Sequence, residues 1–438
     1  MGRGVLAVTA LCAWFLGAAD WPQYRGPHHD GSTPETILTH WPNEGPKVLW
    51  RVPLGDGFGS FVVSGGKAFI FMERAVGGTA SEVCVAFDAS TGKELWASSA
   101  GPTIHENLGG NGPRSTPAAD GERVYLLGTF LKLVCVNAAD GSEVWAHELT
   151  REFGGNLQLQ TSGINSWGSA ASPVLDGNLV FVNGGGKRQA LMAFDKKTGA
   201  VVWKGETELL THSTPVPATI LGTRQIVFLC KSGLVSLAAE TGTVLWRHPF
   251  KFSVSTASTP VVSGDIVYCS AAYDVGTDAC RIEKTDAGYT ATKLWHKDQP
   301  LCHHWTTPVC KDGYVYGIYG FKDFVQAGKP GAPLKCVEIA TGNEMWSQPG
   351  FGSGGATVLV GNHVLARTDA GTLVLVEATP KAYTEVARAT PLGGRCWTMP
   401  AVSGGRIYLR NNDQTRKDAK GAIVSRPEGM CVDVKSDK

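Results

Sequence analysis

The sequence has almost no net charge. Its 438 residues contain 40 Lys and Arg against 39 Asp and Glu, a formal net charge of +1. Partners that recognise bulk charge, nucleic acids above all, need a basic surface that this composition does not supply. We therefore expect no nucleic-acid partner.

Long apolar runs are missing after the first twenty residues. At the N-terminus, Arg3 precedes an apolar run over 5–16 and the small residues 17–19, followed by Asp20. This order is typical of a secretory signal peptide and is too short for a permanent membrane span. We expect residues 1–19 to be a signal peptide and the mature protein to be exported, periplasmic or secreted, without a transmembrane anchor.

Common catalytic and metal motifs are also missing. The sequence has no Gly-x-Ser-x-Gly elbow, phosphate-binding loop or His-Glu-x-x-His pair, so hydrolase and nucleotide chemistry lack support. His303 and His304 are neighbours on an extended segment, where they point to opposite faces and cannot readily share one ion. A second candidate, His105-Glu106-Asn107, offers nitrogen and oxygen ligands but is expected to be a solvated loop. We predict no metal site.

The cysteines do not form an evident disulfide framework. Eleven are present, and Cys12 lies in the expected signal peptide. Four occupy equivalent places in the third strand of different repeats, far apart around a ring, and are expected to be buried rather than bridged: Cys84, Cys135, Cys336 and Cys431. Cys269 and Cys280 flank one long hairpin and could pair.

What the chain does contain is a repeat of about fifty residues marked by Thr/Asp-Gly-x-x-x-Trp. The motif is complete at Thr91–Trp96 and four further places, and degenerate copies fill the gaps. Such a period indicates one supersecondary unit stacked repeatedly, because a single unit cannot bury its apolar face alone. The tryptophans of the series are Trp50, Trp96, Trp145, Trp203, Trp246, Trp295 and Trp346, with a copy lacking Trp around 383–387.

Each repeat reads as four short strands. In the second repeat, segments 115–119, 123–128, 131–137 and 143–146 are separated by turn residues such as Asp120-Gly121 and Asp140-Gly141. Eight second-strand cores follow one another along the chain, which predicts an all-β, eight-bladed β-propeller of four-stranded antiparallel blades. The last blade lacks an outer strand, so we expect 47–50 to supply it and close the ring.

This architecture assigns structural roles and boundaries. Glycine supplies a positive φ in the repeat turn, an upstream Asp caps that turn, and the Trp packs between blades. We expect an N-terminal segment at 20–46, a single propeller domain at 47–434, a tail at 435–438, and a monomer. Besides the tryptophans, the structural residues are Asp88, Gly92, Gly141, Asp195, Gly199, Gly242 and Gly342.

At these residues the chain resembles the PQQ-like, quinoprotein-type β-propeller repeat family. Its pattern, Ala-x-Asp-x-x-Thr-Gly-x-x-x-Trp, is matched in full over 86–96 and over 193–203. The segment Trp21-Pro-Gln-Tyr-Arg-Gly-Pro27 is similar to the opening of exported bacterial PQQ-like propellers. The resemblance covers nearly all of the expected mature chain.

The resemblance implies two different functions. Quinoprotein alcohol dehydrogenases bind pyrroloquinoline quinone and calcium, whereas BamB-like proteins are non-catalytic scaffolds in outer-membrane assembly. This chain lacks the adjacent Cys-Cys pair, the Cys-x-x-Cys-His haem site and the long insertions of the dehydrogenases. We expect a binding or scaffold protein of the cell envelope with no certain cofactor, whose partners are envelope proteins or a small polar ligand. The alternative is a compact dehydrogenase that uses pyrroloquinoline quinone with calcium to oxidise alcohols or sugars.

Candidate binding residues precede the innermost strands. Loops at these places converge on one mouth of a propeller's channel. They carry aromatic and cationic side chains that could stack a flat anionic cofactor or grip a sugar or peptide, or else only plug the channel. The predicted cofactor-binding residues are Arg114, Trp167, His212, His304, Trp305, Arg395 and Trp397, and the same loops contain Phe58, Ser255 and the glycines of 352–355. No catalytic residue is predicted.

Overall fold

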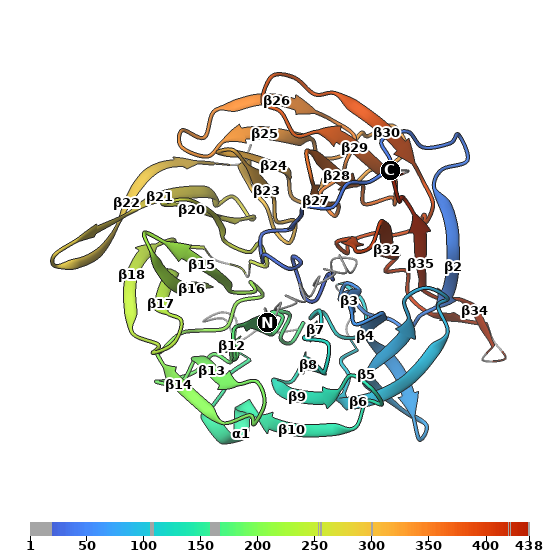
Figure 1. The fold of residues 1–438 in the computed structure, drawn as a ribbon, viewed down its shortest axis with the longest axis horizontal. Coiled ribbons are helices and arrows are strands. Elements are labelled where there is room, and N and C mark those ends of the chain that lie inside the picture. Colours follow the sequence, from blue (N-terminus) through green and yellow to red (C-terminus); the bar gives the residue numbers. More distant parts are fainter. Residues whose placement is uncertain are drawn as a thin grey trace, which may run out of the picture.

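Eight blades surround a central axis (Figure 1). The structure, a computed structural model, describes residues 20–436 except 106–108, 158–166, 253, 255, 299–300, 419 and 421. The expected signal peptide, Glu106, Asn107, Ser255 and the last two residues of the tail therefore lie outside the described residues. Within the described part of the chain, no helix is long and apolar enough to cross a membrane.

The two central strands of each blade form the core. The innermost strands are β3 (Val62–Ser64), β7 (Ala118–Ala119), β11 (Val174–Asp176), β15 (Val216–Ile220), β19 (Val261–Ser263), β23 (Val309–Lys311), β27 (Ala356–Val360) and β31 (Ala401–Val402). The second strands are β4 (Lys67–Val76), β8 (Arg123–Leu127), β12 (Leu179–Asn183), β16 (Thr223–Cys230), β20 (Ile266–Ala271), β24 (Tyr314–Ile318), β28 (His363–Arg367) and β32 (Arg406–Arg410). The third strands are β5 (Thr79–Asp88), β9 (Lys132–Asn137), β13 (Leu191–Asp195), β17 (Gly233–Ala238), β21 (Gly276–Thr285), β25 (Leu334–Glu338), β29 (Leu373–Glu377) and β35 (Glu428–Asp433). Second and third strands are near-continuously apolar because blades cover both of their faces.

The outer strands face solvent on one side and therefore alternate between buried and exposed residues. They are β6 (Glu94–Pro102), β10 (Glu143–Glu148), β14 (Val201–Gly205), β18 (Val244–Pro249), β22 (Gly288–Lys297), β26 (Glu344–Gln348), β30 (Glu385–Ala389) and β2 (Lys47–Pro53). Outside the blade plan are β1 (Ser32–Thr33), a short helix α1 (Leu149–Phe153) and a small hairpin of β33 (Arg416–Lys417) and β34 (Ile423–Ser425).

The eighth blade is completed by the start of the chain. Strand β2 pairs antiparallel with β35, and Trp50 lies opposite Cys431. The sheet order β2-β35-β32-β31 confirms the predicted closure, which leaves no blade with a missing outer strand.

The repeat tryptophan holds each blade to the next. The indole of Trp96 donates to the carbonyl of Ala138 in the following blade at 3.1 Å. It also lies against the turn glycine of that blade, where a Cβ on Gly141 would come within 2.6 Å of the ring. The same contact joins Trp50 to Gly92, Trp145 to Gly199, Trp203 to Gly242 and Trp295 to Gly342. Glycine is therefore required for close approach as well as for its positive φ.

The seam between the fourth and fifth blades has a different hydrogen bond. The fifth blade has no Thr-Gly turn, and the indole of Trp246 instead donates to the Gln225 side chain of its own blade at 2.8 Å. Trp246 belongs to an apolar cluster shared by the fourth and fifth blades, and beside it His248 and His296 contact the buried carboxylate of Asp278 at 2.8 and 2.5 Å. At the next-but-one seam, Trp346 donates to the Thr379 carbonyl of the seventh blade at 2.8 Å although that blade has no Thr-Gly turn, so the contact between blades does not depend on the glycine.

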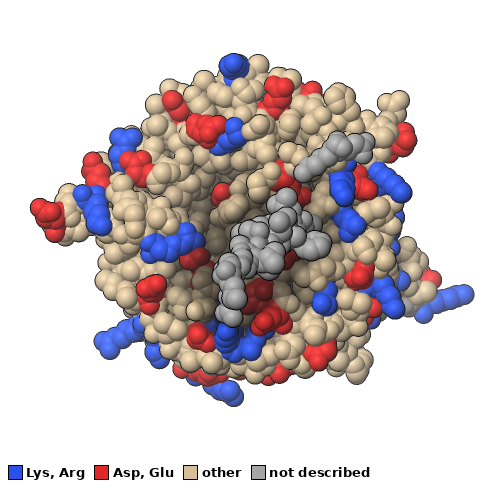
Figure 2. Space-filling view, viewed as in Figure 1, with Lys and Arg blue, Asp and Glu red and all other residues tan. Residues whose placement is uncertain are grey.

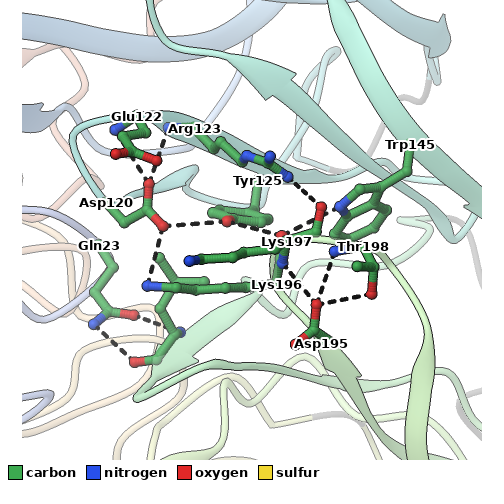
Figure 3. A network of polar contacts seen from close by, with 11 residues as sticks. Gln23, Asp120, Glu122, Arg123, Tyr125, Trp145, Asp195, Lys196, Lys197 and Thr198 are labelled. Carbon is green, nitrogen blue, oxygen red and sulfur yellow. Dashed lines mark hydrogen bonds and ion pairs between the residues drawn. The ribbon is translucent and has the colours of Figure 1, made fainter.

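Polar contacts reinforce the seam between the second and third blades (Figure 3). The ammonium of Lys196 lies 3.1 Å from Asp120, and the Lys196 carbonyl accepts from Tyr125 at 3.1 Å and from Trp145 at 3.2 Å. In the turn beside them, Asp195 accepts from the amide of Thr198 at 2.8 Å, as predicted for the capping Asp. Several contacts of this seam therefore converge on the turn of the third blade.

The ten cysteines of the described chain are all free thiols. Cys84, Cys135, Cys336 and Cys431 are fully buried, as predicted. Cys269 and Cys280 are also buried but unbonded, which corrects the possible pairing. They lie on neighbouring strands, but Cys269 is opposite Asp278 and Cys280 is opposite Val267, so they are out of register.

Candidate functional site

The N-terminal segment crosses one end of the channel, here called the base. Trp21 exchanges backbone hydrogen bonds with Val63, and Gln23 binds both polar backbone groups of Leu175. Further along, β1 pairs parallel with the end of β27, and Glu35 accepts from the amides of Gly404 and Gly405. These contacts are made to the C-terminal ends of inner strands on opposite sides of the ring. In Figure 1 the segment, drawn in blue, runs from the centre past β27 to the rim.

A cavity of about 600 Å³ occupies the other end, here called the mouth. Tyr24 of the N-terminal segment is part of its lining. Because the same segment spans the base, we interpret the cavity as a cup that is approached from the mouth. Figure 2, in the same view as Figure 1, shows Lys, Arg, Asp and Glu interspersed over one face of the ring.

The structure brings the predicted site residues together. Six of the seven line the cavity: Arg114, Trp167, His212, His304, Trp305 and Trp397. The seventh, Arg395, lies behind the wall, with its guanidinium carbon 4.6 Å from the Trp397 ring centre. Phe58 and Gly355 also line the cavity. The aromatic side chains therefore form walls around a space, which does not support the interpretation that they only plug the channel.

Trp397 is the centre of the aromatic wall. Its ring lies 5.1 Å from that of Trp305 and 6.4 Å from that of Phe58, centre to centre. Phe324 stacks on it at 5.2 Å with only 16° between the ring planes. Such contacts between rings fix their orientation beyond what area burial alone would do.

Part of the wall was not found from the sequence. Phe321, Lys322 and Phe324 come from the connection between β24 and β25, and Tyr273 from the turn between β20 and β21. These are connections between second and third strands, whereas the prediction considered only loops before inner strands. The usable signal was the unusual length of the connection over 319–333, because long loops of compact domains are often functional.

Arg395 is held mainly by the protein itself. Its Nε and one Nη donate to the carbonyl of Asn412 at 3.0 and 2.6 Å, and the other Nη donates to Gly109 at 3.0 Å. Arg114 similarly donates to the carbonyl of Gly110 at 3.0 Å, and its guanidinium lies 5.0 Å from the Phe58 ring centre. Both arginines therefore brace the wall through carbonyl and cation–π contacts.

Deeper in the cavity, hydroxyl groups connect successive blades. The hydroxyl of Thr116 accepts from the amide of Ser60 at 2.9 Å, Ser172 from Thr116 at 2.9 Å, and Thr214 from Ser172 at 3.0 Å. Thr307 accepts from Thr259 at 2.9 Å. These hydroxyls belong to the Ser/Thr-Pro sequences that precede the inner strands, and all four residues line the cavity.

Three arginines are completely buried around the channel without a carboxylate partner among the described residues. Arg25 donates to the carbonyls of Thr307, Pro308 and Asp30, and its Nε has no hydrogen-bond partner. Arg367 and Arg410 likewise bind carbonyl groups, and Arg367 also contacts the Cys396 sulfur. Burial lowers the pKa of all three, to about 9 for Arg410. The carbonyls accept several of their N–H groups but do not neutralise their charge, and the Nε of Arg25 and of Arg367 has no hydrogen-bond partner among the described residues.

The histidines of the cavity are neutral near pH 7. Burial lowers the pKa of His212 to about 3 and that of His304 to about 4, and for His304 nearby Lys322 contributes further. His303 faces the interior instead, contacting the Tyr268 hydroxyl and the Ile318 carbonyl, both at 2.9 Å. The two neighbouring imidazoles thus have different surroundings, and the described residues include no group of three side chains arranged to hold a metal ion.

Acidic side chains stand near the cavity but not in its described lining. Burial raises the pKa of Asp369 to about 6, and this carboxylate accepts from the Val325 amide at 3.1 Å behind the glycines of 352–355. Burial also raises the pKa of Glu82 to about 7, although Thr129 donates to it from its amide at 3.0 Å. Of the second metal candidate, only His105 is described, 3.8 Å from Glu73.

The described lining does not fit calcium with a quinone. Calcium in proteins is held by carboxylate, carbonyl and amide oxygens. The lining contains neither Asp or Glu nor Asn or Gln among the described residues, although its aromatic and cationic groups could contact a flat anion.

Known solved structures share this fold. A quinohemoprotein alcohol dehydrogenase from Comamonas testosteroni is similar with a TM-score of 0.65 at 15% identity, over 96% of this chain and 81% of that one. BamB from Moraxella catarrhalis is similar with a TM-score of 0.57 at 15% identity, over 89% of this chain and 98% of that one. At these identities the likeness shows the fold alone.

Sequence comparisons match the chain to BamB proteins. The outer membrane protein assembly factor BamB of Burkholderia pseudomallei (strain K96243) is 29% identical over 241 residues, which are 52% of this chain. The match spans about half the length of that relative, 55%. The family model described as outer membrane protein assembly factor BamB matches residues 79–319 and 331–420, most of the propeller. This chain therefore belongs to the BamB family of β-propeller proteins.

Proposed function

We propose that this protein is an exported binding or scaffold protein of the cell envelope, and that its mouth cavity is the site at which it binds. Family membership supports a non-catalytic role, because the relative found by sequence is an outer membrane assembly factor. The N-terminal sequence supports export, although residues 1–19 lie outside the described structure.

One observation carries the proposal. The cavity combines aromatic walls and several hydroxyl groups with a described lining that has no carboxylate. Binding sites are concave and largely apolar, with a few placed polar groups. General acid or base chemistry would need a titratable group in reach of a reactant. Here the two lining histidines are buried and partly engaged, since His212 contacts the Gly168 carbonyl at 3.0 Å.

The alternative is a compact dehydrogenase dependent on pyrroloquinoline quinone. The aromatic and cationic wall is compatible with a flat anion, but the lining offers calcium no carboxylate or amide oxygen from a described side chain. Calorimetry of the protein with the quinone separates the two functions. We expect no difference between titrations with and without calcium, and no alcohol or sugar oxidation by the mixture.

Calcium-dependent quinone binding that Trp397→Ala abolishes would contradict the proposal and favour the dehydrogenase. The matched control is Trp41→Ala, because Trp41 lies outside the cavity in the N-terminal segment and donates to the Leu38 carbonyl at 3.0 Å. Fractionation of cells that produce the full-length chain tests export. Recovery in the cytoplasm with the first nineteen residues still attached would exclude an envelope role.

A further inference from the structure

We propose that the mouth cavity selects a small organic anion, a carboxylate attached to an apolar or aromatic body, and that the hydroxyl groups deep in the cavity receive the carboxylate. The inference rests on the proposed function, since it names the ligand class of the same cavity. It rests on hydroxyl donors that lack acceptors and on cations that lack carboxylate partners among the described residues, neither of which the amino-acid sequence revealed.

Four hydroxyl groups in the cavity lining have protons that they can donate. Thr116, Ser172, Thr214 and Thr307 each use an oxygen lone pair to accept a backbone amide of the preceding blade. A hydroxyl has one donor besides its two acceptor lone pairs. No acceptor for these four protons is found among the described residues, and all four residues line the cavity. The deep part of the cavity therefore presents several O–H donors that need acceptors.

A buried guanidinium lies next to the hydroxyl groups. Arg25 is fully buried and bound to the carbonyls of Thr307 and Pro308, beside the lining residue Thr307. No described carboxylate forms an ion pair with it. A buried cation whose charge is not neutralised raises the affinity of the adjacent space for an anion.

The mouth carries a lysine that forms no ion pair with a described carboxylate. Lys322 lines the cavity, and its ammonium lies 5.0 Å from the Phe321 ring centre. Among described residues it has no carboxylate partner, unlike Lys196 or Lys335, whose ammonium groups contact Asp120 and Glu344. The positive charge of Lys322 in the cavity lining favours the entry of anions.

The aromatic walls determine the rest of the ligand. Trp167, Trp305, Phe324 and Trp397 surround the space above the hydroxyl groups with apolar surface. A free inorganic anion would leave this surface exposed to water, whereas an aromatic or aliphatic body would cover it. A carboxylate with an apolar body satisfies both layers of the cavity at once.

The test compares an anion with its neutral isostere. We would titrate the full-length mature protein with para-fluorophenylacetate and with para-fluorophenylacetamide, and follow fluorine NMR line widths. We expect the carboxylate to bind at least about tenfold more tightly than the amide, as one to two hydrogen bonds to a charged group would give.

Variants locate the carboxylate. Thr214→Val removes the hydroxyl at nearly constant volume and should reduce the preference for the anion about tenfold, whereas Thr214→Ser should keep it. Lys322→Gln should weaken carboxylate binding and its salt dependence, while Lys67→Gln, in β4 and outside the cavity lining, should not. Thermal unfolding of each variant checks that the fold is intact.

Two results would overturn the inference and can be told apart. The proposed selectivity for carboxylates is wrong if the carboxylate and the amide bind with equal affinity. It is also wrong if Thr214→Val folds and binds both compounds as the wild type does. In either case the cavity remains a binding site. If neither compound binds, and a panel of neutral and anionic aromatic compounds also fails, the proposed function of the cavity falls together with the inference.

Discussion

The two ends of the channel are formed by the opposite ends of the same eight inner strands, and they differ in what fills them. At the base, a segment of the chain itself supplies backbone partners to inner strands and buries Trp21 and Arg25. At the mouth, no described segment does so, and side chains surround an open space. The end that the described chain does not fill is available for another molecule.

We expect the largest difference in the free energy of unfolding when one aromatic side chain is removed from each end. Trp21 is 1% exposed at the base, and Trp21→Ala should cost about 3–5 kcal/mol of unfolding free energy, because it empties a packed site. Trp167→Ala at the mouth should cost less, since that ring already faces the cavity. Denaturant unfolding measures both, and equal losses would remove the distinction between the ends.

A second contrast is the change with pH in the stability that residues near the mouth contribute. Glu82 has a pKa raised to about 7, above the ordinary value near 4.5 that it regains on unfolding. Its contribution to stability is fully present below pH 4.5 and is lost as the pH rises through 7, by up to roughly 3 kcal/mol. Glu82→Gln should flatten the decline in stability over this range.

The contribution of the mouth histidines to stability changes with pH in the opposite direction. The pKa values of His212 and His304 are lowered to about 3 and 4, so their contribution is present above pH 6.5 and lost as the pH falls towards those values. Denaturant midpoints of the wild type and of Glu82→Gln between pH 4 and 8 separate the two effects. An unchanged slope in the Gln variant would show that Glu82 is ionised in the folded protein.

The smallest expected effect compares two glycines with positive φ. A Cβ on Gly31 would lie 2.9 Å from Val309 and 3.2 Å from the Arg25 guanidinium, whereas one on Gly350 would meet nothing within 4 Å. Both alanine variants pay for the backbone strain, about 1 kcal/mol, and Gly31→Ala should lose one or two more because it displaces Arg25. Thermal unfolding checks the difference, and matching values would mean that the base tolerates rearrangement.

The sequence predicted the blades well because their signals are local. Turn glycines, capping Asp88 and Asp195, and the spacing of the tryptophans are each decided within a few residues. The predicted wall residues Trp305 and Trp397 were found because they precede inner strands. Lys322 and Phe324 were missed because their connection reaches the mouth only through the fold, and the sequence did not indicate that the indole of Trp246 would donate to Gln225 within its own blade.

The base was missed for a related reason. Trp21 and Arg25 stand in a segment without periodicity, and their partners lie in blades that are 40 to 280 residues away, such as Val63 and Thr307. Nothing in the local sequence specifies such contacts. Likewise, the donor excess of the cavity emerges only when hydrogen bonds are counted residue by residue in three dimensions.

The closing strand also sets the order in which the molecule can be made. Strand β2 is synthesised before any blade, but its partner β35 is among the last residues to leave the ribosome. Throughout translation, β2 is an unpaired edge with Val48 and Leu49 available for wrong partners. Seven blades can assemble one after another, while the eighth must wait for the whole chain. Premature termination after β30 but before β35 would therefore release a nearly complete ring that carries an exposed edge and is prone to aggregate.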